Sequence, residues 1–200
     1  MMSVEAREGL LPLCPFSKEQ AKGIGVSGMV TKKQRCLHAL YRITGCAQSI
    51  VVSKKNAPTP TRQNGLWETT CFELFLKYPH TSEYVEFNFS PSGDWNAYHF
   101  SDYRKEMREF DDVENIKIEF TQSAEVSQLE ATIQLKEKIS LLDHPLSVGL
   151  CAVVETTLIR HDGQLSPASG PIILRKSYWA LQHADLKPDF HLADSFTLII

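Results

Sequence analysis

The 200-residue sequence contains no run of about 18 consecutive apolar residues, the minimum for a membrane-spanning helix. Its first residues include early acidic side chains, and no basic stretch followed by an apolar one is present. A secretory signal peptide would require that pattern. We therefore expect no membrane partner, no signal peptide and a cytoplasmic location.

An excess of basic charge is also absent. The sequence has 21 Lys and Arg against 24 Asp and Glu, a net charge of −3, whereas nucleic-acid binding usually requires a basic surface. The five cysteines are widely spaced and form no C-x-x-C, and the seven histidines show no metal-ligand spacing. Phosphate-binding loops, HExxH and GxSxG are missing as well. These absences predict no nucleic-acid partner, no metal site and no standard catalytic set.

What the sequence does contain is a series of alternating segments. Residues 71–76, 84–90 and 95–100 each alternate between two faces, and the turn formers of residues 91–94 connect the last two. Similar segments recur along the chain, whereas regular alternation of strands and helices is absent. About nine to eleven short strands predict an all-β fold, an antiparallel β-sandwich formed by residues 1–200 as one domain. One or two short helical turns are expected within 101–112 and 136–145, and residues 172–182 fit either a strand or a helix.

The three neighbouring strands would share a polar face. It would carry Glu73, Glu86, Asn88, Asn96 and Tyr98. A pair of carboxylates about 5 to 10 Å apart is the arrangement of glycoside hydrolases, so Glu73 and Glu86 could act as such a pair. The alternative is that both are sheet-face carboxylates held by neighbouring polar groups.

The three tryptophans form the second candidate feature. Trp67, Trp95 and Trp179 each lie beside polar residues at strand ends or in loops. The apolar faces of sugars stack on indole rings, while planar polar side chains bind the hydroxyls. The alternative is that the tryptophans close the ends of the sandwich as core residues.

Residues 65–104, with LWETTCFELFL and YVEFNFSPSGDWNAYHFSDYR, and residues 175–200, with SYWALQH, KPDFH and FTLII, carry a family resemblance. The chain resembles the DOMON-like proteins of bacteria, which are related to family 9 carbohydrate-binding modules. The resemblance implies an immunoglobulin-like β-sandwich that binds a ligand and is not an enzyme. In those modules two tryptophans grip a sugar beside a glutamate. Trp67, Glu73 and Trp179 would occupy the corresponding positions.

The hypothesis is therefore a non-enzymatic domain that binds a small molecule, a sugar or sugar derivative. Trp67 and Trp179 would stack on it, and Glu73 would bind its hydroxyls. Further polar contacts are assigned to Asn96, Tyr98 and Arg175. Three alternatives stay open: a haem- or redox-cofactor-binding domain that uses Met107 or His99, a hydrolase that uses Glu73 and Glu86, and a protein-docking face.

Overall fold

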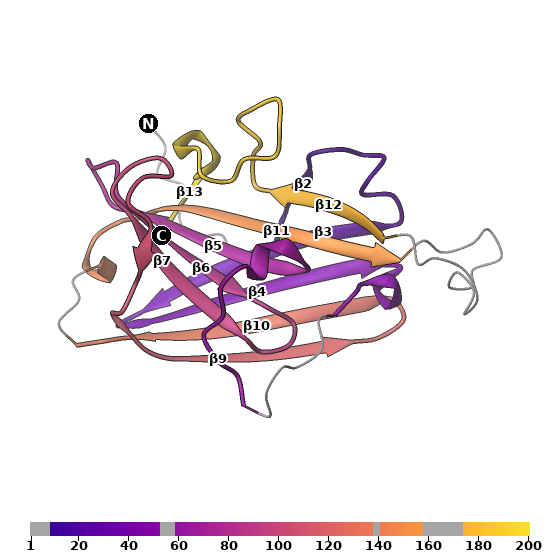
Figure 1. Ribbon diagram of the computed structural model, residues 1–200, viewed down its shortest axis with the longest axis horizontal. Helices are drawn as coiled ribbons and strands as arrows, with labels where there is room; N and C mark the ends of the chain where they lie inside the picture. Colours follow the sequence, from indigo (N-terminus) through magenta and orange to yellow (C-terminus); the bar gives the residue numbers. More distant parts are fainter. Residues whose placement is uncertain (1–8, 53–58, 138–140, 158–173) are drawn as a thin grey trace.

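The computed structural model describes residues 9–52, 59–137, 141–157 and 174–200. Within these residues 13 strands form two antiparallel sheets that stack as a β-sandwich (Figure 1), which confirms the predicted fold class. Four of the strands are only two residues long. Short 3-10 turns lie at Ala47–Ser49 (η1), Leu66–Glu68 (η2), Leu141–Asp143 (η3) and Ala193–Ser195 (η4). No helix in the described part of the chain is long and apolar enough to cross a membrane.

The smaller sheet has five strands in the order β1-β3-β4-β10-β9. They are β1 (Leu11–Pro12), β3 (Ile24–Lys33), β4 (Cys36–Gly45), β10 (Val126–Leu135) and β9 (Val113–Gln122). Their side chains alternate between buried and exposed, as expected when one face covers the core and the other meets solvent.

The larger sheet runs in the order β2-β12-β11-β5-β6-β7-β8, and β13 also pairs with β11. Its strands are β2 (Cys14–Pro15), β12 (Leu174–Ala180), β11 (Ser147–Thr157), β5 (Cys71–Lys77), β6 (Tyr84–Phe89), β7 (Trp95–Phe100), β8 (Arg108–Glu109) and β13 (Leu198–Ile199). All six residues of β6 are buried. Both faces of the centre of this sheet are therefore covered, unlike those of the smaller sheet.

The main core lies between the two sheets. On the inner face of the larger sheet, Phe72, Leu74 and Phe87 are at most 1% exposed. Tyr41 of β4 crosses the core, and its hydroxyl donates a hydrogen bond to the backbone oxygen of Glu73 at 2.7 Å. This bond satisfies a buried phenol and joins the two sheets beneath the strand that carries Glu73.

The register of the larger sheet determines its outer face. Glu73 lies opposite Asn88, which lies opposite Asn96, and Glu86 lies opposite Tyr98. Paired residues project from the same side of a sheet, so these five side chains share one face, as the alternation predicted. The turn that connects β6 and β7 also forms as expected.

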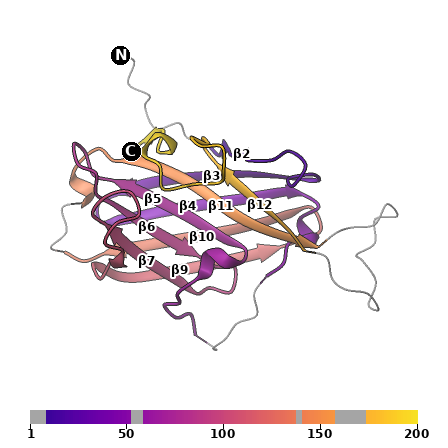
Figure 2. The ribbon, with the colours of Figure 1, turned by 45° about the horizontal axis from the view of Figure 1, so that its top comes forward.

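Two segments behave differently from their sequence patterns. Residues 101–112 form turns and β8 but no helix, because Arg104 and Glu106 adopt positive φ angles of 52° and 50°. The ambiguous segment 172–182 forms β12 in its described part. Residues 181–197 then fold over the outer face of the larger sheet, where Phe190 and Phe196 pack (Figure 2).

Candidate functional site

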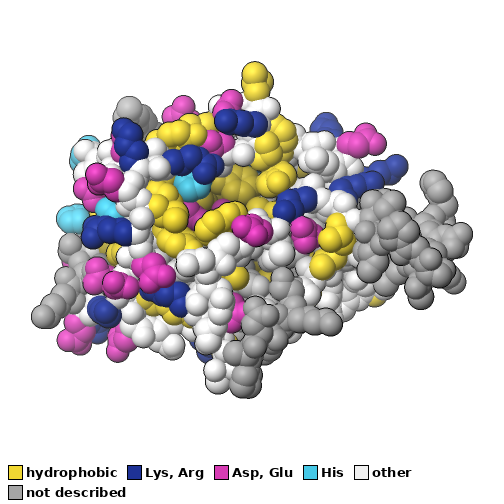
Figure 3. Space-filling view, in the orientation of Figure 1, with side chains coloured by type: hydrophobic (Ala, Val, Ile, Leu, Met, Phe, Trp, Pro, Cys, Tyr) yellow, Lys and Arg dark blue, Asp and Glu magenta, His cyan; other side chains and the backbone are white. Residues whose placement is uncertain are grey.

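A pocket of about 630 Å³ opens on the outer face of the larger sheet. In the space-filling view, hydrophobic side chains gather around a hollow over this sheet, with charged and histidine side chains among them (Figure 3). The lining residues are Trp67, Glu68, Glu73, Glu86, Phe100, Arg104, Met107, Val153, Lys176, Tyr178, Pro188, Phe190 and His191. The lining therefore combines aromatic walls with a small number of ionisable groups, as ligand pockets commonly do.

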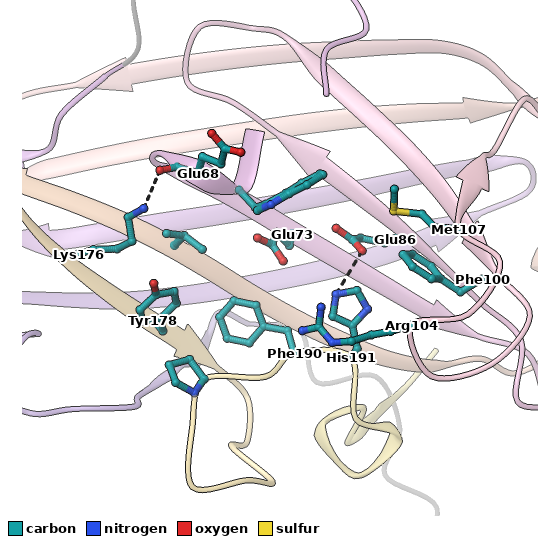
Figure 4. Close-up of a pocket in the computed structure, with 13 residues that line it drawn as sticks. Glu68, Glu73, Glu86, Phe100, Arg104, Met107, Lys176, Tyr178, Phe190 and His191 are labelled. Atoms are coloured by element: carbon teal, nitrogen blue, oxygen red, sulfur yellow. Dashed lines mark hydrogen bonds and ion pairs between the residues drawn. The ribbon is translucent and has the colours of Figure 1, made fainter. Parts of the chain in front are cut away.

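Separate parts of the chain supply this lining. The central strands β5 and β6 contribute Glu73 and Glu86, which point into the middle of the pocket (Figure 4). Arg104 comes from the segment after β7, and His191 comes from the segment after β12. The carboxylates therefore sit on rigid strands, while loops bring the groups that surround them.

The Glu73 carboxyl group lies at the pocket and has no hydrogen-bonding partner among the described residues. Glu73 is 3% exposed, and none of the described residues donates a hydrogen bond to its carboxylate or forms an ion pair with it. Burial raises its pKa well above the ordinary value, and the neighbouring charge of Glu86 raises that pKa further. Arg104 lowers it, but only as the smallest contribution. Polar groups in such surroundings are normally hydrogen-bonded, and the Glu73 oxygens, which border the pocket, are open to a donor from a ligand or from water.

Glu86 lies next to Glu73 on the adjacent strand and, unlike Glu73, accepts a hydrogen bond from a described side chain. Its Oε1 accepts a hydrogen bond of 2.6 Å from Nδ2 of Asn88. Burial raises the pKa of Glu86 to about 7, against the opposing effects of the Asn88 hydrogen bond and the Arg104 charge. The pocket therefore contains two adjacent carboxyl groups that both resist ionisation.

A chain of polar groups from the loops and from Tyr84 of β6 leads to Glu86. The Arg104 amide donates to the Tyr84 hydroxyl at 3.2 Å, and that hydroxyl lies 2.8 Å from Nδ1 of His191. Nε2 of His191 is 3.7 Å from Oε2 of Glu86. Burial lowers the pKa of His191 to about 4, so the ring is neutral near pH 7. Every donor is used when Tyr84 donates to Nδ1, which leaves the ring proton on Nε2 facing Glu86.

Trp67 of η2 also lines the pocket, and its side chain is 38% exposed. Its ring contacts Tyr98 edge to face, with 5.8 Å between the ring centroids. The Tyr98 hydroxyl in turn donates to Asn64 and accepts from Asn96, each at 2.8 Å. Because Tyr98 and Asn96 are held in this buried network behind the indole, they brace Trp67 and do not themselves line the pocket.

Some of the predicted site residues line the pocket and others do not. Trp67 and Glu73 line the same pocket, as the hypothesis required. Trp179 does not, because it shares a register row with Ala152 and Phe72 on the inner face and is 3% exposed in the core. Its indole Nε1 donates to the Ser177 hydroxyl at 2.9 Å. Trp179 is therefore a core residue, and the expectation that it would stack on a ligand together with Trp67 is wrong.

Arg175 also lies outside the pocket. It is two residues from Ser177 on the same strand, so it projects to the same side as the core residues. Its guanidinium donates to the backbone oxygen of Glu19 at 3.3 Å. The neighbouring residues of β12, Lys176 and Tyr178, line the pocket in its place.

The sequence interpretation did not assign Glu86, Arg104, Tyr178, Phe190 or His191 to the binding site. The shared polar face was a signal for Glu86. Tyr178 could have been found only with the face of β12 known. Arg104 and His191 lie in loops without a periodic pattern, and no sequence signal places them beside Glu86.

The described residues do not suit the haem alternative. His99 lies outside the pocket, where its Nε2 contacts Glu83 at 3.0 Å and its Nδ1 accepts from Arg108. Met107 lines the pocket together with His191, but both ring nitrogens of His191 already face protein partners. Iron would need a free ring nitrogen directed at open space. Within the described part of the chain, no group of three or more His, Cys, Asp or Glu side chains could hold a metal ion.

Comparisons with known proteins place the fold. No protein-family model and no curated protein matches the sequence. Among solved structures, the chain is similar to a protein from Bacteroides uniformis that is described as a candidate carbohydrate-binding protein, with a TM-score of 0.55 and 14% identity over 94% of this chain and 84% of that one. A weaker likeness is to a family 9 carbohydrate-binding module from Caldicellulosiruptor kristjanssonii in complex with glucose, with a TM-score of 0.37 and 10% identity over 79% of this chain and 66% of that one.

Proposed function

We propose that the protein binds a small hydroxylated ligand of the sugar class in this pocket and does not transform it. The observation that carries the proposal is the Glu73 carboxylate, which is buried at the pocket and has no hydrogen-bond donor among the described residues. A hydroxyl group supplies such a donor and at the same time remains uncharged.

The aromatic side chains of the pocket suit the apolar faces of a sugar ring. A pyranose ring presents apolar C–H groups on its faces and hydroxyls around its edge. Trp67 offers an exposed aromatic surface, and Phe190 and Tyr178 add apolar area elsewhere in the pocket. Each stacking or hydrogen-bonding contact contributes about 1 kcal/mol. A monosaccharide that makes a few such contacts is expected to bind in the millimolar to micromolar range.

The assignment to the DOMON-like proteins belongs to this proposal as well. It is supported by the resemblance of residues 65–104, which supply Trp67, Glu73 and Glu86 to the pocket. The Bacteroides uniformis protein of similar fold is described as a candidate carbohydrate-binding protein, and the proposal assigns that ligand class to this chain.

Isothermal titration with a panel of mono- and disaccharides tests the proposal. Wild-type protein should bind at least one sugar at millimolar concentration, and Trp67→Ala and Glu73→Ala should each weaken that binding about five- to tenfold. Val126→Ala serves as the control, because Val126 has a similar exposed fraction, 39%, on the smaller sheet. Absence of heat with every sugar, or equal binding by all variants, would refute the proposal.

The hydrolase alternative uses Glu73 and Glu86, so the same variants separate it from binding. It requires turnover of an activated aryl glycoside that disappears in Glu73→Gln. We expect no turnover, because a glycoside hydrolase needs one of its two carboxyl groups ionised as nucleophile or base, whereas burial raises the pKa values of both Glu73 and Glu86. Glu73-dependent turnover by the wild type would overturn the non-catalytic part of the proposal.

A further inference from the structure

Carboxyl groups outnumber basic side chains around the pocket, and the two central ones, Glu73 and Glu86, have raised pKa values because they are buried. Five acidic residues, Glu68, Glu73, Glu86, Glu155 and Asp189, line it or pair with the residues that do. Two basic residues, Arg104 and Lys176, line it. His191 adds no positive charge near neutral pH, because burial lowers its pKa to about 4.

Both basic residues already have hydrogen-bonding or ion-pair partners other than Glu73 and Glu86. Nη2 of Arg104 donates to Asp189 at 3.0 Å, and Tyr103 also donates to that carboxylate. Nζ of Lys176 donates to the backbone oxygen of Glu68 at 2.6 Å and lies 3.4 Å from the Glu155 carboxylate. Neither Arg104 nor Lys176 therefore forms an ion pair with Glu73.

The free carboxylate and its neighbour form an acceptor pair. Glu73 and Glu86 project from adjacent strands on one face, offset by one register row. Diagonal neighbours in an antiparallel sheet lie roughly 7 Å apart at Cβ, within reach of a single small group held between their carboxylates. Oε1 of Glu86 is used by Asn88, whereas Oε2 faces His191 only at 3.7 Å. A group with several donors and one positive charge matches this pair better than a hydroxyl with one donor.

Aromatic rings complete the environment. Trp67, Phe100, Tyr178 and Phe190 all line the same pocket. Aromatic faces attract ammonium groups, and the attraction grows when the cation is desolvated. The walls that would stack on a sugar ring therefore also suit a positively charged substituent on it.

From this geometry we propose that the preferred ligand carries a protonated primary amine on its hydroxylated ring, that is, an amino sugar, with the ammonium held by Glu73 and Glu86. This inference rests on the proposed sugar-binding function and narrows its ligand class. Trp67 takes the ring, while the two carboxylates select the charge.

Isothermal titration with glucosamine, glucose and N-acetylglucosamine tests the inference, because the three sugars share one ring and differ in a single substituent. The titrations are carried out at a pH below the pKa of the sugar amine, so that the amine is protonated. Charge-assisted hydrogen bonds are roughly twice as strong as neutral ones. We therefore expect glucosamine to bind about tenfold more tightly than glucose, and N-acetylglucosamine to lose that advantage because acetylation removes the charge. Cyclohexylamine, which has the amine without hydroxyls, should bind more weakly than glucosamine.

Two isosteric variants locate the selectivity. Glu73→Gln and Glu86→Gln keep the side-chain volume but remove the charge, so each should reduce the preference for glucosamine over glucose to within about twofold. Glu114→Gln, an exposed position on β9, should leave the preference unchanged. Circular dichroism of each variant before titration confirms that it is folded.

Each outcome decides one of the two claims. Equal affinity for glucose and glucosamine, with both lost in Trp67→Ala, overturns the amino-sugar inference and leaves sugar binding intact. A preference that persists in both Gln variants also overturns the inference. Cyclohexylamine that binds as tightly as glucosamine overturns the role of the sugar ring. If no ligand of the panel produces heat, sugar binding itself is refuted.

Discussion

Replacing Glu86 by Gln should stabilise the protein, by an amount that depends on pH. Gln retains the Oε1 that accepts from Asn88 and removes the buried charge. The folded-state pKa of Glu86 is about 7, above its ordinary value of 4.5. Between these values the folded state binds a proton that the unfolded chain releases, so the wild type loses stability as the pH rises through this window.

The size of the effect follows from the same shift. The difference between about 7 and 4.5 is about 2.5 pKa units, and one unit corresponds to about 1.4 kcal/mol. The variant should therefore gain about 3 kcal/mol in free energy of unfolding above pH 7 relative to the wild type, and close to nothing below pH 4.5. The gain should develop progressively between these limits.

His191 requires attention because it titrates with the opposite sign. Its folded-state pKa is lowered to about 4 from 6.5, so its contribution makes the protein more stable as the pH rises between these values. In the wild type, this trend opposes that of Glu86. Burial, Arg104 and Asp189 shift the pKa of His191, and all three remain in Glu86→Gln. The difference between the two proteins therefore reports the loss of the Glu86 charge, together with the lower pKa that Glu73 has without that charge beside it.

Urea unfolding followed by tryptophan fluorescence at a series of pH values measures this difference. Glu114→Gln provides the control for loss of one carboxylate at an exposed position. A stability difference that does not change with pH, or a variant less stable than the wild type at neutral pH, would refute the argument. Either result would mean that Glu86 is ionised and well stabilised in the folded protein.

The remaining predictions concern the core and the charge beside the carboxylates. Trp179→Ala should lower the free energy of unfolding by about 3 to 5 kcal/mol, because it removes a buried indole. Trp67→Ala removes a partly exposed indole and should lower that free energy by less than about 1 kcal/mol. Chemical denaturation of both variants measures the two losses, and equal losses would contradict the prediction. Arg104→Gln should raise the pKa values of Glu73 and Glu86 further, because the guanidinium lowers both. Carbon NMR of the carboxyl groups would show upward movement of both titrations, and unchanged midpoints would exclude that influence.

The sequence predicted the parts of the site that depend on strand periodicity. Alternation within residues 71–100 is enough to place Glu73 and Glu86 on one face, since side chains of a strand alternate with a period of two. It could not place Trp179, because a strand with an uncertain face leaves either Tyr178 or Trp179 toward the core, and an offset of one residue exchanges them. The tertiary packing decides the question, and the larger indole fills the core while the tyrosine lines the pocket.

The loop contributions had no such periodic signal. Arg104 and His191 are separated by most of the C-terminal half of the chain, yet Tyr84 contacts both. Their positions depend on how residues 101–107 and 181–197 fold over the sheet. Arg104 adopts a left-handed backbone conformation that a pattern of helix-favouring residues does not indicate, and that conformation is the reason the predicted helical turn fails. Local propensity was overridden here by tertiary contacts.

The outer face of the larger sheet also raises the question of whether its polar groups merely support the covering loops. Phe75, Tyr84, Phe100 and Phe196 form a second apolar cluster on that face, and this cluster by itself accounts for the packing of the loops. The Glu73 carboxyl group has no hydrogen-bond donor among the described residues, so ionising it there would oppose folding. Neutral isosteres that increase stability while they abolish discrimination between charged and neutral sugars would connect these two properties to the same pair of side chains. A purely structural face would show the gain in stability without any change in binding.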